Sequence, residues 1–324
     1  MTSTDIVLGI DIGATRTKLG RVSEAGEMIS LGDLETRSDE PVDRFWERLF
    51  SAVEALGEAG DQPVRLRGVG VGAPNANPFS GKIEDPPNLG WGNVEVVEPL
   101  RDRFGVPVAI TNDANASAMG ELTFGAARGM AHFIQVTLGT GVGSGIVVDG
   151  RLVHGHSGLA GELGHVTAVR GGRVCGCGKR GCLDPYASAT GLCRTVFELL
   201  ADRPDPSPLR RVRYADLDGH RVFEAARRED PIALEAFSRT GRILGEALAD
   251  AVALFSPQAV VLFGGLAAAG DLIFDPVRTR MEGALFPVFR NTVRVIPSAL
   301  PADTAGVLGA AALIWRPEAM PKRR

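Results

Sequence analysis

Two glycine-rich turns follow apolar runs and carry groups that suit phosphate binding. The first is Asp11-Ile12-Gly13-Ala14-Thr15-Arg16-Thr17-Lys18, and the second is Gly139-Thr140-Gly141-Val142-Gly143. Backbone N–H groups in such turns can hold phosphate oxygens, and the Asp11 carboxylate can bind Mg²⁺ directly or through water. Neither turn has the Walker or the Rossmann pattern. Each alone fits an ordinary hairpin, but the pair indicates a nucleotide site more strongly than either one.

A third polar stretch, Thr111-Asn112-Asp113-Ala114-Asn115, joins an expected strand to an expected helix. Asp113 could simply be the N-cap of that helix. In a catalytic role, its carboxylate could accept the proton of a hydroxyl nucleophile. The spacing alone leaves both roles open.

One histidine and three cysteines have the spacing of a metal site. His165 is followed by Cys175, Cys177 and Cys182, with glycines between the cysteines. One imidazole and three thiolates complete a tetrahedral zinc shell without an open position, which is typical of a structural site. Cys193 lies in an apolar helical stretch and is predicted to be a core residue.

Regular elements must position these stretches. Hydrophobic periodicity predicts strands over 6–10, 18–23, 67–71, 107–111, 132–138, 144–148 and 259–263, and helices over 41–59, 112–129, 187–200, 231–255 and 304–315. Each half of this order opens with a hairpin around a glycine turn. The weak repetition predicts a two-lobed α/β protein with a cleft between the lobes.

Composition excludes several classes of protein. Among 324 residues, 41 are glycine and 20 proline without a collagen period, and the 44% apolar content can form a packed core. The net charge of −4 and the absence of a basic stripe argue against a nucleic-acid partner. The longest basic run, Lys322-Arg323-Arg324, is expected to be a solvated tail. We expect a cytoplasmic protein, because no signal peptide and no apolar run of ~18 residues is recognisable.

These stretches, taken in order, resemble the ROK family of sugar kinases, within the actin/hexokinase/Hsp70-like superfamily. The matching stretches are DIGATRTKLG (11–20), GVGAPNANPFSGKIEDPPNLGW (70–91), NDANASAMGE (112–121), LGTGVGSGIVVDG (138–150), GLAGELGHV (158–166), CGCGKRGCLD (175–184) and VVLFGGLAAAGD (260–271). They cover nearly the whole chain, and the zinc segment is the most specific. The resemblance is greatest to the bacterial glucokinase branch, through PPNLGW and YASATG.

This resemblance implies a two-lobed actin-like ATPase fold, which is related to ribonuclease H. The small lobe would hold residues 1–115 together with the C-terminal helix at about 301–324, and the large lobe would hold 116–300. The implied activity is ATP-dependent phosphorylation of a hexose, glucose above all, at its 6-hydroxyl. Asp113 would be the general base, and Asp11 would lie near Mg²⁺.

The resemblance also implies which residues bind the substrates. ATP would be held by the two turns and by a glycine pair beside the adenosine, that is by Asp11, Gly13, Thr15, Lys18, Gly139, Thr140, Gly141, Gly143, Gly264 and Gly265. The sugar would contact Asn75, Asn88, Asn112, Asp113, Glu162, His165 and Asp184. His165 would also bind the structural Zn²⁺, which would fix the loop that carries Glu162.

Two departures from the family pattern affect these implied roles. The family usually has glutamate after the last zinc cysteine, and Asp184 is one methylene shorter, so contact with the sugar or the preferred sugar could differ. Ala14 replaces a common glycine, which is tolerable only where φ is negative.

Several alternatives stay open at this point. N-acetylmannosamine, N-acetylglucosamine, fructose or allose could replace glucose, and polyphosphate could replace ATP. A non-catalytic sugar-binding regulator would have to account for an intact Asp113 and both turns. Family members that bind DNA carry an N-terminal helix-turn-helix domain, for which the strand near Ile6 leaves no room. We expect a sugar substrate, no nucleic acid, no membrane, and a homodimer or homotetramer.

Overall fold

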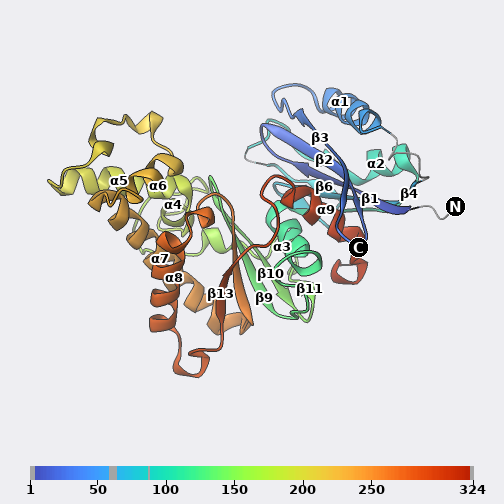
Figure 1. Cartoon of the computed structure of the whole chain (residues 1–324). Coiled ribbons are helices and arrows are strands. Elements are labelled where there is room, and N and C mark those ends of the chain that lie inside the picture. Colours follow the sequence, from blue (N-terminus) through green and yellow to red (C-terminus); the bar gives the residue numbers. More distant parts are fainter. Residues whose placement is uncertain (1–3, 58–63, 87, 322–324) are drawn as a thin grey trace. The chain divides into compact units, whose positions relative to one another are not determined.

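The computed structural model describes residues 4–57, 64–86 and 88–321, which form two compact units (Figure 1). Unit 1 comprises the described residues of 1–131, 145–161 and 299–324, and unit 2 comprises 132–144 and 162–298. The basic run Lys322-Arg323-Arg324 lies outside the described residues. None of the helices in the described ranges combines the length and apolar character needed to cross a bilayer.

The main sheet of unit 1 brings two functional stretches to one edge. Its strands have the order β3-β2-β1-β4-β8, with bounds β1 Thr4–Ile12, β2 Arg16–Ser23, β3 Met28–Glu35, β4 Val64–Ala73 and β8 Val108–Asn112. β4 runs parallel to both β1 and β8, and it pairs Gly72 with Asp11 and Ala73 with Asn112. Because the carboxyl ends of parallel strands meet at the same edge of a sheet, Asp11 lies at the same edge as the helix that starts at Asp113, directly after β8.

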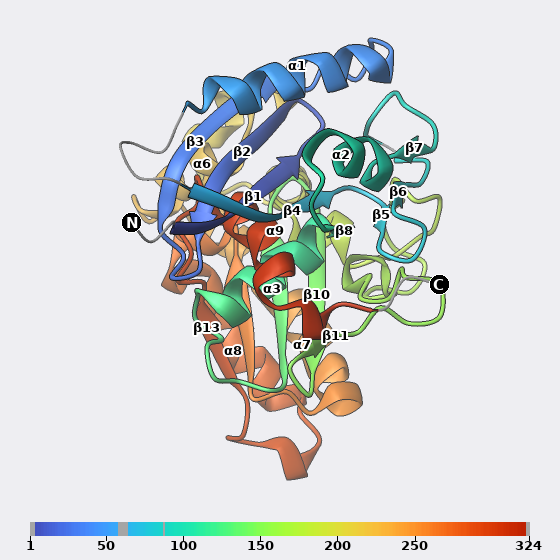
Figure 2. The same cartoon turned by 90° about the vertical axis from the view of Figure 1, so that its right-hand side faces the viewer.

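Helices cover both faces of this sheet (Figure 2). On one face, helices α1 (Val42–Ala55) and α2 (Val97–Phe104) share a buried core with β1 and β4, to which Phe45, Leu49, Leu100, Ile10 and Val71 contribute. On the other face lies α9 (Ala305–Trp315), with α3 (Asp113–Thr123) packed against it. The alternation of side chains along a strand places glycines on this second face.

Close backbone contact explains those glycines. A Cβ atom on Gly70 would lie 1.8 Å from the carbonyl oxygen of Ala310 in α9. Between α3 and α9, a Cβ atom on Gly309 would lie 2.5 Å from the carbonyl oxygen of Ala116. The short strands β5 (Ala76–Asn77), β6 (Lys82–Ile83) and β7 (Val94–Glu95) form a separate small sheet.

The second large sheet repeats the strand order of the first. It reads β11-β10-β9-β12-β13, with bounds β9 Phe133–Leu138, β10 Val142–Val148, β11 Arg151–Leu152, β12 Ala259–Phe263 and β13 Arg294–Pro297. β12 runs parallel to β9 and to β13, as β4 does to β1 and β8. The predicted repetition of the two halves is therefore confirmed at the level of strand order. One of the points at which the chain passes between the units falls within β10, after Ser144.

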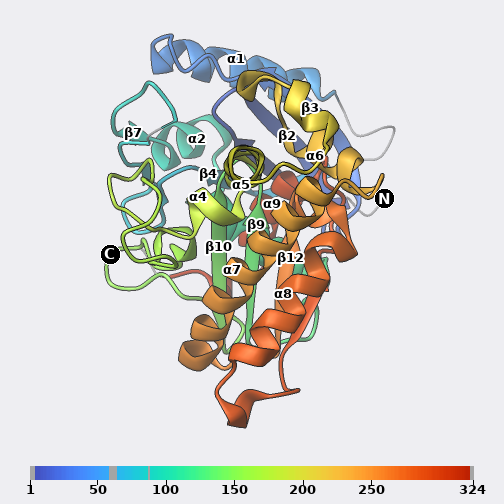
Figure 3. The same cartoon turned by 90° about the vertical axis from the view of Figure 1, so that its left-hand side faces the viewer.

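Unit 2 also contains the helices α4 (Asp184–Ala187), α5 (Ala189–Asp202), α6 (Gly219–Ala226), α7 (Pro231–Phe255) and α8 (Asp271–Ala284). α7 and α8 lie side by side (Figure 3). Their close approach depends on two glycines of α7. A Cβ atom on Gly241 would lie 2.6 Å from Pro276 Cγ, and one on Gly245 would lie 2.7 Å from the Val277 carbonyl oxygen.

Sequence and structure differ at several elements. The helix predicted over 112–129 ends at Thr123, where the Glu121 carboxylate accepts a hydrogen bond from the Ala126 N–H and holds the chain in a turn. β3, α2, α6, α8 and β13 were not predicted. Unit 1 includes all of α3, because α3 packs on α9, whereas the expected large lobe begins at residue 116. The lobe boundaries implied by the resemblance stay a prediction.

Candidate functional site

Two acids lie at the carboxyl edge of the unit 1 sheet, Asp11 half-buried and Asp113 exposed at the surface of that unit. Asp11 ends β1, and Asp113 is the first residue of α3. Gly72 of β4 faces both of them, because a Cβ atom there would lie 3.9 Å from Asp11 Oδ1 and 3.7 Å from Asp113 Cα. The nearest atom to such a Cβ would be Ala116 Cβ at 3.1 Å, so glycine allows α3 to pack closely on β4 beside the two acids.

Both acids have environments that favour their protonated form. Burial raises the pKa of Asp11 to about 6, the charge of Asp113 adds to that rise, and Lys18 opposes it. Desolvation by the surrounding protein also raises the pKa of Asp113, although the backbone N–H groups of Ala114 and of Asp113 itself oppose the rise. A carboxylate with a raised pKa is a better proton acceptor near neutral pH. Lys18 itself donates a hydrogen bond from Nζ to the Asp303 carbonyl oxygen at 2.8 Å.

At the start of α3, Asn112 and Asp113 have different roles in capping the helix. Asn112 is the N-cap, and its Oδ1 accepts a hydrogen bond from the Ala114 N–H at 2.9 Å. The same N–H lies 2.8 Å from Asp113 Oδ1. The capping role that the sequence left open for Asp113 therefore belongs to Asn112.

The first glycine turn joins β1 to β2. Gly13 N–H donates to the Arg16 carbonyl oxygen at 3.0 Å, and the Thr15 carbonyl oxygen accepts from Thr36 N–H at 2.9 Å, while the Thr15 residue is exposed. A residue that sequence reasoning missed is Gly306, in the first turn of α9. A Cβ atom there would lie 2.0 Å from Asp11 Oδ2. The positive end of this helix therefore adjoins the turn, where anions are favoured.

The two asparagines expected near the sugar differ in environment. Asn75 has a left-handed backbone with φ 50°, and its Nδ2 donates to the carbonyl oxygens of Glu84 at 3.1 Å and Asp85 at 3.2 Å. Asn88 is exposed. Asn75 therefore shapes the loop that follows it.

In unit 2, the four expected metal ligands come together. The ligand atoms of His165, Cys175, Cys177 and Cys182 all lie within 4.8 Å of one another. Cys177 Sγ lies 3.7 Å from Cys182 Sγ, and Cys175 Sγ lies 3.6 Å from His165 Nδ1. A tetrahedral zinc ion with Zn–S bonds of about 2.3 Å would separate its sulfur ligands by about 3.8 Å. The donor set and its spacing therefore fit zinc.

Cys193 and Glu162 are not among these four residues. Cys193 is buried in α5, outside the four-residue cluster, which confirms the prediction that it belongs to the core. Glu162 is exposed and directly precedes the single helical turn Leu163–His165. Leu163 N–H donates to Ser144 Oγ at 3.1 Å, which fixes the start of this turn.

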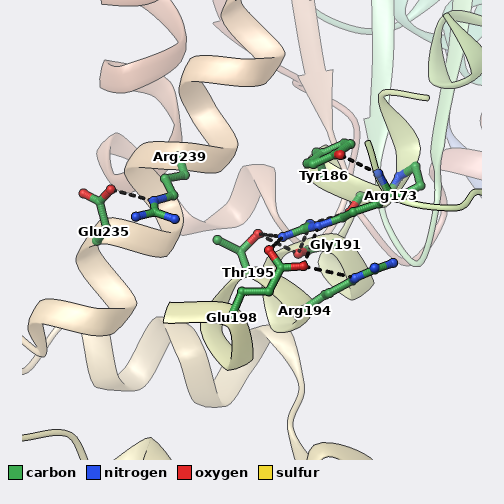
Figure 4. Close-up of polar contacts among 9 residues, drawn as sticks. Arg173, Tyr186, Gly191, Arg194, Thr195, Glu198, Glu235 and Arg239 are labelled. Atoms are coloured by element: carbon green, nitrogen blue, oxygen red, sulfur yellow. Dashed lines mark hydrogen bonds and ion pairs between the residues drawn. The ribbon is translucent and has the colours of Figure 1, made fainter. Parts of the chain in front are cut away.

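Arg173 holds the segment that carries the four candidate ligands, residues 165–182 (the metal loop), against α4 and α5 (Figure 4). Its guanidinium donates to the carbonyl oxygens of Pro185 at 2.6 Å and Gly191 at 3.2 Å, and it pairs with Glu198 at 2.5 Å. It also lies over the Tyr186 ring, 4.5 Å from the centroid. The arginine side chain is 7% exposed, so these bonds replace nearly all of its contact with water.

A cavity of about 470 Å³ in unit 2 has the size and lining of a nucleoside site. Its polar side is the second glycine turn, and its apolar side comes from α6, α7 and the chain after β12; the lining includes Gly139, Thr140, His220, Phe223, Phe237 and Gly265. A Cβ atom on Gly265 would meet nothing within 4 Å, while Gly264 has φ 101°. His220, to which no role could be assigned from the sequence, is exposed and lines this cavity.

Asp184 contacts the second glycine turn. Its Oδ1 accepts a hydrogen bond from the Val142 N–H at 2.7 Å, and a Cβ atom on Gly141 would lie 2.9 Å from the same oxygen. The resemblance implies a sugar contact for this residue. The contact that the structure shows is to the turn.

The expected residues thus form two groups, one in each unit. Unit 1 holds Asp11, Gly13, Thr15, Lys18, Asn75, Asn88, Asn112 and Asp113. Unit 2 holds Gly139, Thr140, Gly141, Gly143, Glu162, His165, Cys175, Cys177, Cys182, Asp184, Gly264 and Gly265. The first group contains the candidate base, and the second contains the candidate metal site and the cavity.

Comparison with known proteins gives consistent matches over almost the full length. The sequence model of the ROK family matches residues 7–316. The chain is 34% identical over 321 residues to a glucokinase of Thermotoga maritima, covering 95% of this chain and 96% of that protein. These shares exclude a match confined to one unit.

Solved structures agree. A ROK family glucokinase from Streptomyces griseus, in complex with glucose and AMPPNP, matches with a TM-score of 0.80 and 33% identity over 95% of this chain and 98% of that one. A ROK hexokinase from Thermus thermophilus matches with a TM-score of 0.77 and 32% identity over 95% and 97%. The fold is the two-lobed actin-like ATPase fold that these structures have. Motifs, topology and these similarities lead to one conclusion: the chain belongs to the ROK family.

Proposed function

We propose that this protein is a hexose kinase that transfers the γ-phosphoryl group of ATP to the 6-hydroxyl of glucose. The observation that carries the proposal is the pair of acids with raised pKa values, Asp11 and Asp113, at one edge of the unit 1 sheet. Relatives named glucokinase that match almost the full length support the choice of sugar.

The residues present suit the parts that phosphoryl transfer needs, namely positioning, a metal ion and charge stabilisation. Asp113 would accept the proton of the attacking hydroxyl, a task for which its raised pKa suits it. Asp11 would hold Mg²⁺, directly or through water, next to the first turn. The Mg²⁺ ion would neutralise charge on the phosphates when bound.

The cavity in unit 2 supports ATP as the donor. Its aromatic and aliphatic lining, with Phe223, Phe237 and Leu266, suits the flat apolar faces of a nucleobase. Polyphosphate has no group that would fill such a lining. ATP therefore accounts for the cavity better than polyphosphate does.

The metal cluster supports a structural zinc. Four protein ligands leave no open coordination position for substrate, as in structural sites. Zinc bound there would fix the turn of Leu163–His165 and with it Glu162, which would contact sugar hydroxyls. A homodimer or homotetramer stays a proposal that light scattering on the purified protein would test.

The test of the function is an ADP-release assay with ATP and Mg²⁺ over glucose, fructose, allose, N-acetylglucosamine and N-acetylmannosamine. We expect glucose to give the highest kcat/KM. The variant Asp113→Asn should lower kcat by about 10²- to 10⁴-fold, the usual contribution of a general base. As a matched control, Asp43→Asn changes an exposed carboxyl on α1 and should leave kcat unchanged.

Two results would reject the proposal. The absence of turnover with every hexose would leave a sugar-binding regulator as the remaining function. Full activity in Asp113→Asn would remove Asp113 from the mechanism. A higher kcat/KM for another hexose would retain the kinase and change its substrate.

A further inference from the structure

The second glycine turn donates a hydrogen bond to, and accepts hydrogen bonds from, residues 184–190, which follow the last metal ligand in the sequence. The Asp184 carboxylate accepts a hydrogen bond from Val142 N–H at 2.7 Å. It approaches the turn closely enough that any side chain on Gly141 would collide with it.

Two more hydrogen bonds come from the first residues of α5. The Ala189 N–H donates to the Gly139 carbonyl oxygen at 2.8 Å, and the Thr190 hydroxyl donates to the Thr140 carbonyl oxygen at 2.5 Å. Gly139 and Thr140 also line the cavity of unit 2. Residues 184–190 therefore fix the backbone of the turn that faces the candidate nucleotide site.

The same residues are tied to the metal loop. Cys182, a metal ligand, lies two positions before Asp184, and Leu183 N–H donates to the Val166 carbonyl oxygen at 3.0 Å. Val166 directly follows His165, another ligand. The candidate ligands thus lie on both segments of the hydrogen-bonded pair, the one with His165 and Val166 and the one with Cys182 and Leu183. The pairing of these two segments sets the position of Asp184.

Arg173 adds a second connection, as Figure 4 shows. It lies two residues before Cys175 and donates hydrogen bonds to the carbonyl oxygens of Pro185 and Gly191, one on either side of the α4–α5 junction. The Tyr186 hydroxyl accepts a hydrogen bond from Arg173 N–H at 2.7 Å. Disorder in the metal loop would therefore reach residues 184–190 by two routes, through the backbone after Cys182 and through Arg173.

We propose that Asp184 is a positioning residue for the second glycine turn, and that metal binding at the four ligands strengthens nucleotide binding through it. This inference rests on the proposed function, because it requires that the turn binds a nucleotide. In this arrangement the shorter side chain of aspartate, where the family usually has glutamate, serves the phosphate turn.

The first experiment measures ADP and glucose affinities separately by calorimetry, with Mg²⁺ present. Asp184→Ala should weaken ADP binding about tenfold and leave the glucose Kd within about twofold, because the lost hydrogen bond belongs to the turn. Asp184→Asn keeps an oxygen acceptor and should stay within about threefold of the parent protein. Asp250→Ala, an exposed carboxyl on α7, is the matched control.

The second experiment removes the bound metal with a chelator, returns the protein to Mg²⁺ buffer and repeats the ADP titration. Stripping should weaken ADP binding about tenfold in the parent protein but by less than about threefold in Asp184→Ala. The two losses overlap because both act through one side chain, which is the signature of coupled sites. Thr190→Val carries the same test if Asp184→Ala does not fold.

The outcomes separate the inference from the proposed function. If the parent protein does not bind ADP, the proposed function fails. If it binds ADP but Asp184→Ala mainly weakens glucose binding, Asp184 contacts the sugar and the inference is overturned. Equal effects of metal removal in both proteins would also overturn it, as would a loss in Asp184→Asn as large as in Asp184→Ala.

Discussion

Asp113 has the surroundings of a base. Its side chain is reached by solvent, but the surrounding protein removes part of its hydration; its partners are the backbone N–H groups at the start of α3, with no cation among the charges that shift its pKa. Desolvation without a cation disfavours the ionised form, so the pKa of the carboxyl rises. A sugar hydroxyl placed beside it would meet an acceptor suited to taking its proton.

Asp11 carries a cost in stability that its proposed role at Mg²⁺ would explain. Its pKa in the folded protein is about 6, above the 3.8 of an unperturbed aspartate, so folding favours the protonated form between these values. Above pH 6 the group is ionised in both states, and its burial costs the folded state about 3 kcal/mol. A fold retains a destabilising acid of this kind only where its other interactions offset this cost in free energy, as at many active sites.

We therefore expect Asp11→Asn to be more stable and less active than the parent protein. At pH 7.5 without divalent metal, the free energy of unfolding should rise by up to about 3 kcal/mol, and this gain should vanish below about pH 4. Urea unfolding of both proteins at pH 7.5 and below about pH 4 measures this difference in the free energy of unfolding. Reduced stability of the variant at pH 7.5 would show that Asp11 is not a destabilised acid.

At the scale of elements, the metal loop 165–182 contains little regular structure. Between the turn of Leu163–His165 and α4 it has isolated bridges, Thr167 with Cys182 and Val174 with Arg180. Its apolar side chains Val166 and Val174 are exposed, so we expect a bound metal ion and Arg173 to supply most of the order of this segment.

The prediction for this loop compares two cysteines. Cys177→Ser should lose bound zinc, measured by atomic emission on purified protein, and should lower the melting temperature by several degrees. Cys193→Ala removes a buried thiol in α5 and should keep about one zinc per chain. Zinc at full stoichiometry in Cys177→Ser, or none in the parent protein, would contradict the assignment of the site.

Some elements could be predicted from the sequence because their pattern is undisturbed. Helix α7 and strand β12 have the predicted bounds, since a long amphipathic run and a short buried run give clear signals. α8 was missed because Pro276 interrupts its helical pattern, although the ring packs over Gly241 of α7. β3 was missed because apolar residues occur on both of its faces, with Leu31 46% exposed.

The candidate site also contains residues that could be predicted from the sequence and residues that could not. The four metal ligands could be predicted from their spacing, because they lie close together in sequence. The contact of Asp184 with Val142 could not, because it joins residues 42 positions apart. His220 and Gly306 were missed because neither carries a local motif, and each is placed beside its site by the packing of a whole helix.

For the whole molecule, the pH dependence of stability should include a contribution from His154. This residue is 6% exposed, packs edge-on against Phe79, and has no hydrogen-bond partner for either ring nitrogen in the described part of the chain. Burial lowers its pKa to about 4, below the 6.5 of a free histidine. As pH falls through 6.5, the unfolded chain takes up a proton that the folded chain does not, so stability is lost.

Between pH 7.5 and pH 5 this effect should lower the free energy of unfolding by about 2 kcal/mol. In His154→Leu the loss over this interval should be smaller by that amount. His156→Leu, which changes an exposed neighbour, should keep the slope of the parent protein. Chemical unfolding at several pH values measures the slopes, and equal slopes in all three proteins would show that His154 does not titrate as described.

The position of α9 in the sequence has a consequence for synthesis in the cell. The face of the unit 1 sheet formed by β1 and β4 is complete by residue 73, but its cover begins at residue 305. At usual translation rates the ribosome needs on the order of tens of seconds to make the chain between them. During that interval the sheet is without this cover, and nascent chains of this protein should depend on chaperones more than chains whose units are continuous in sequence.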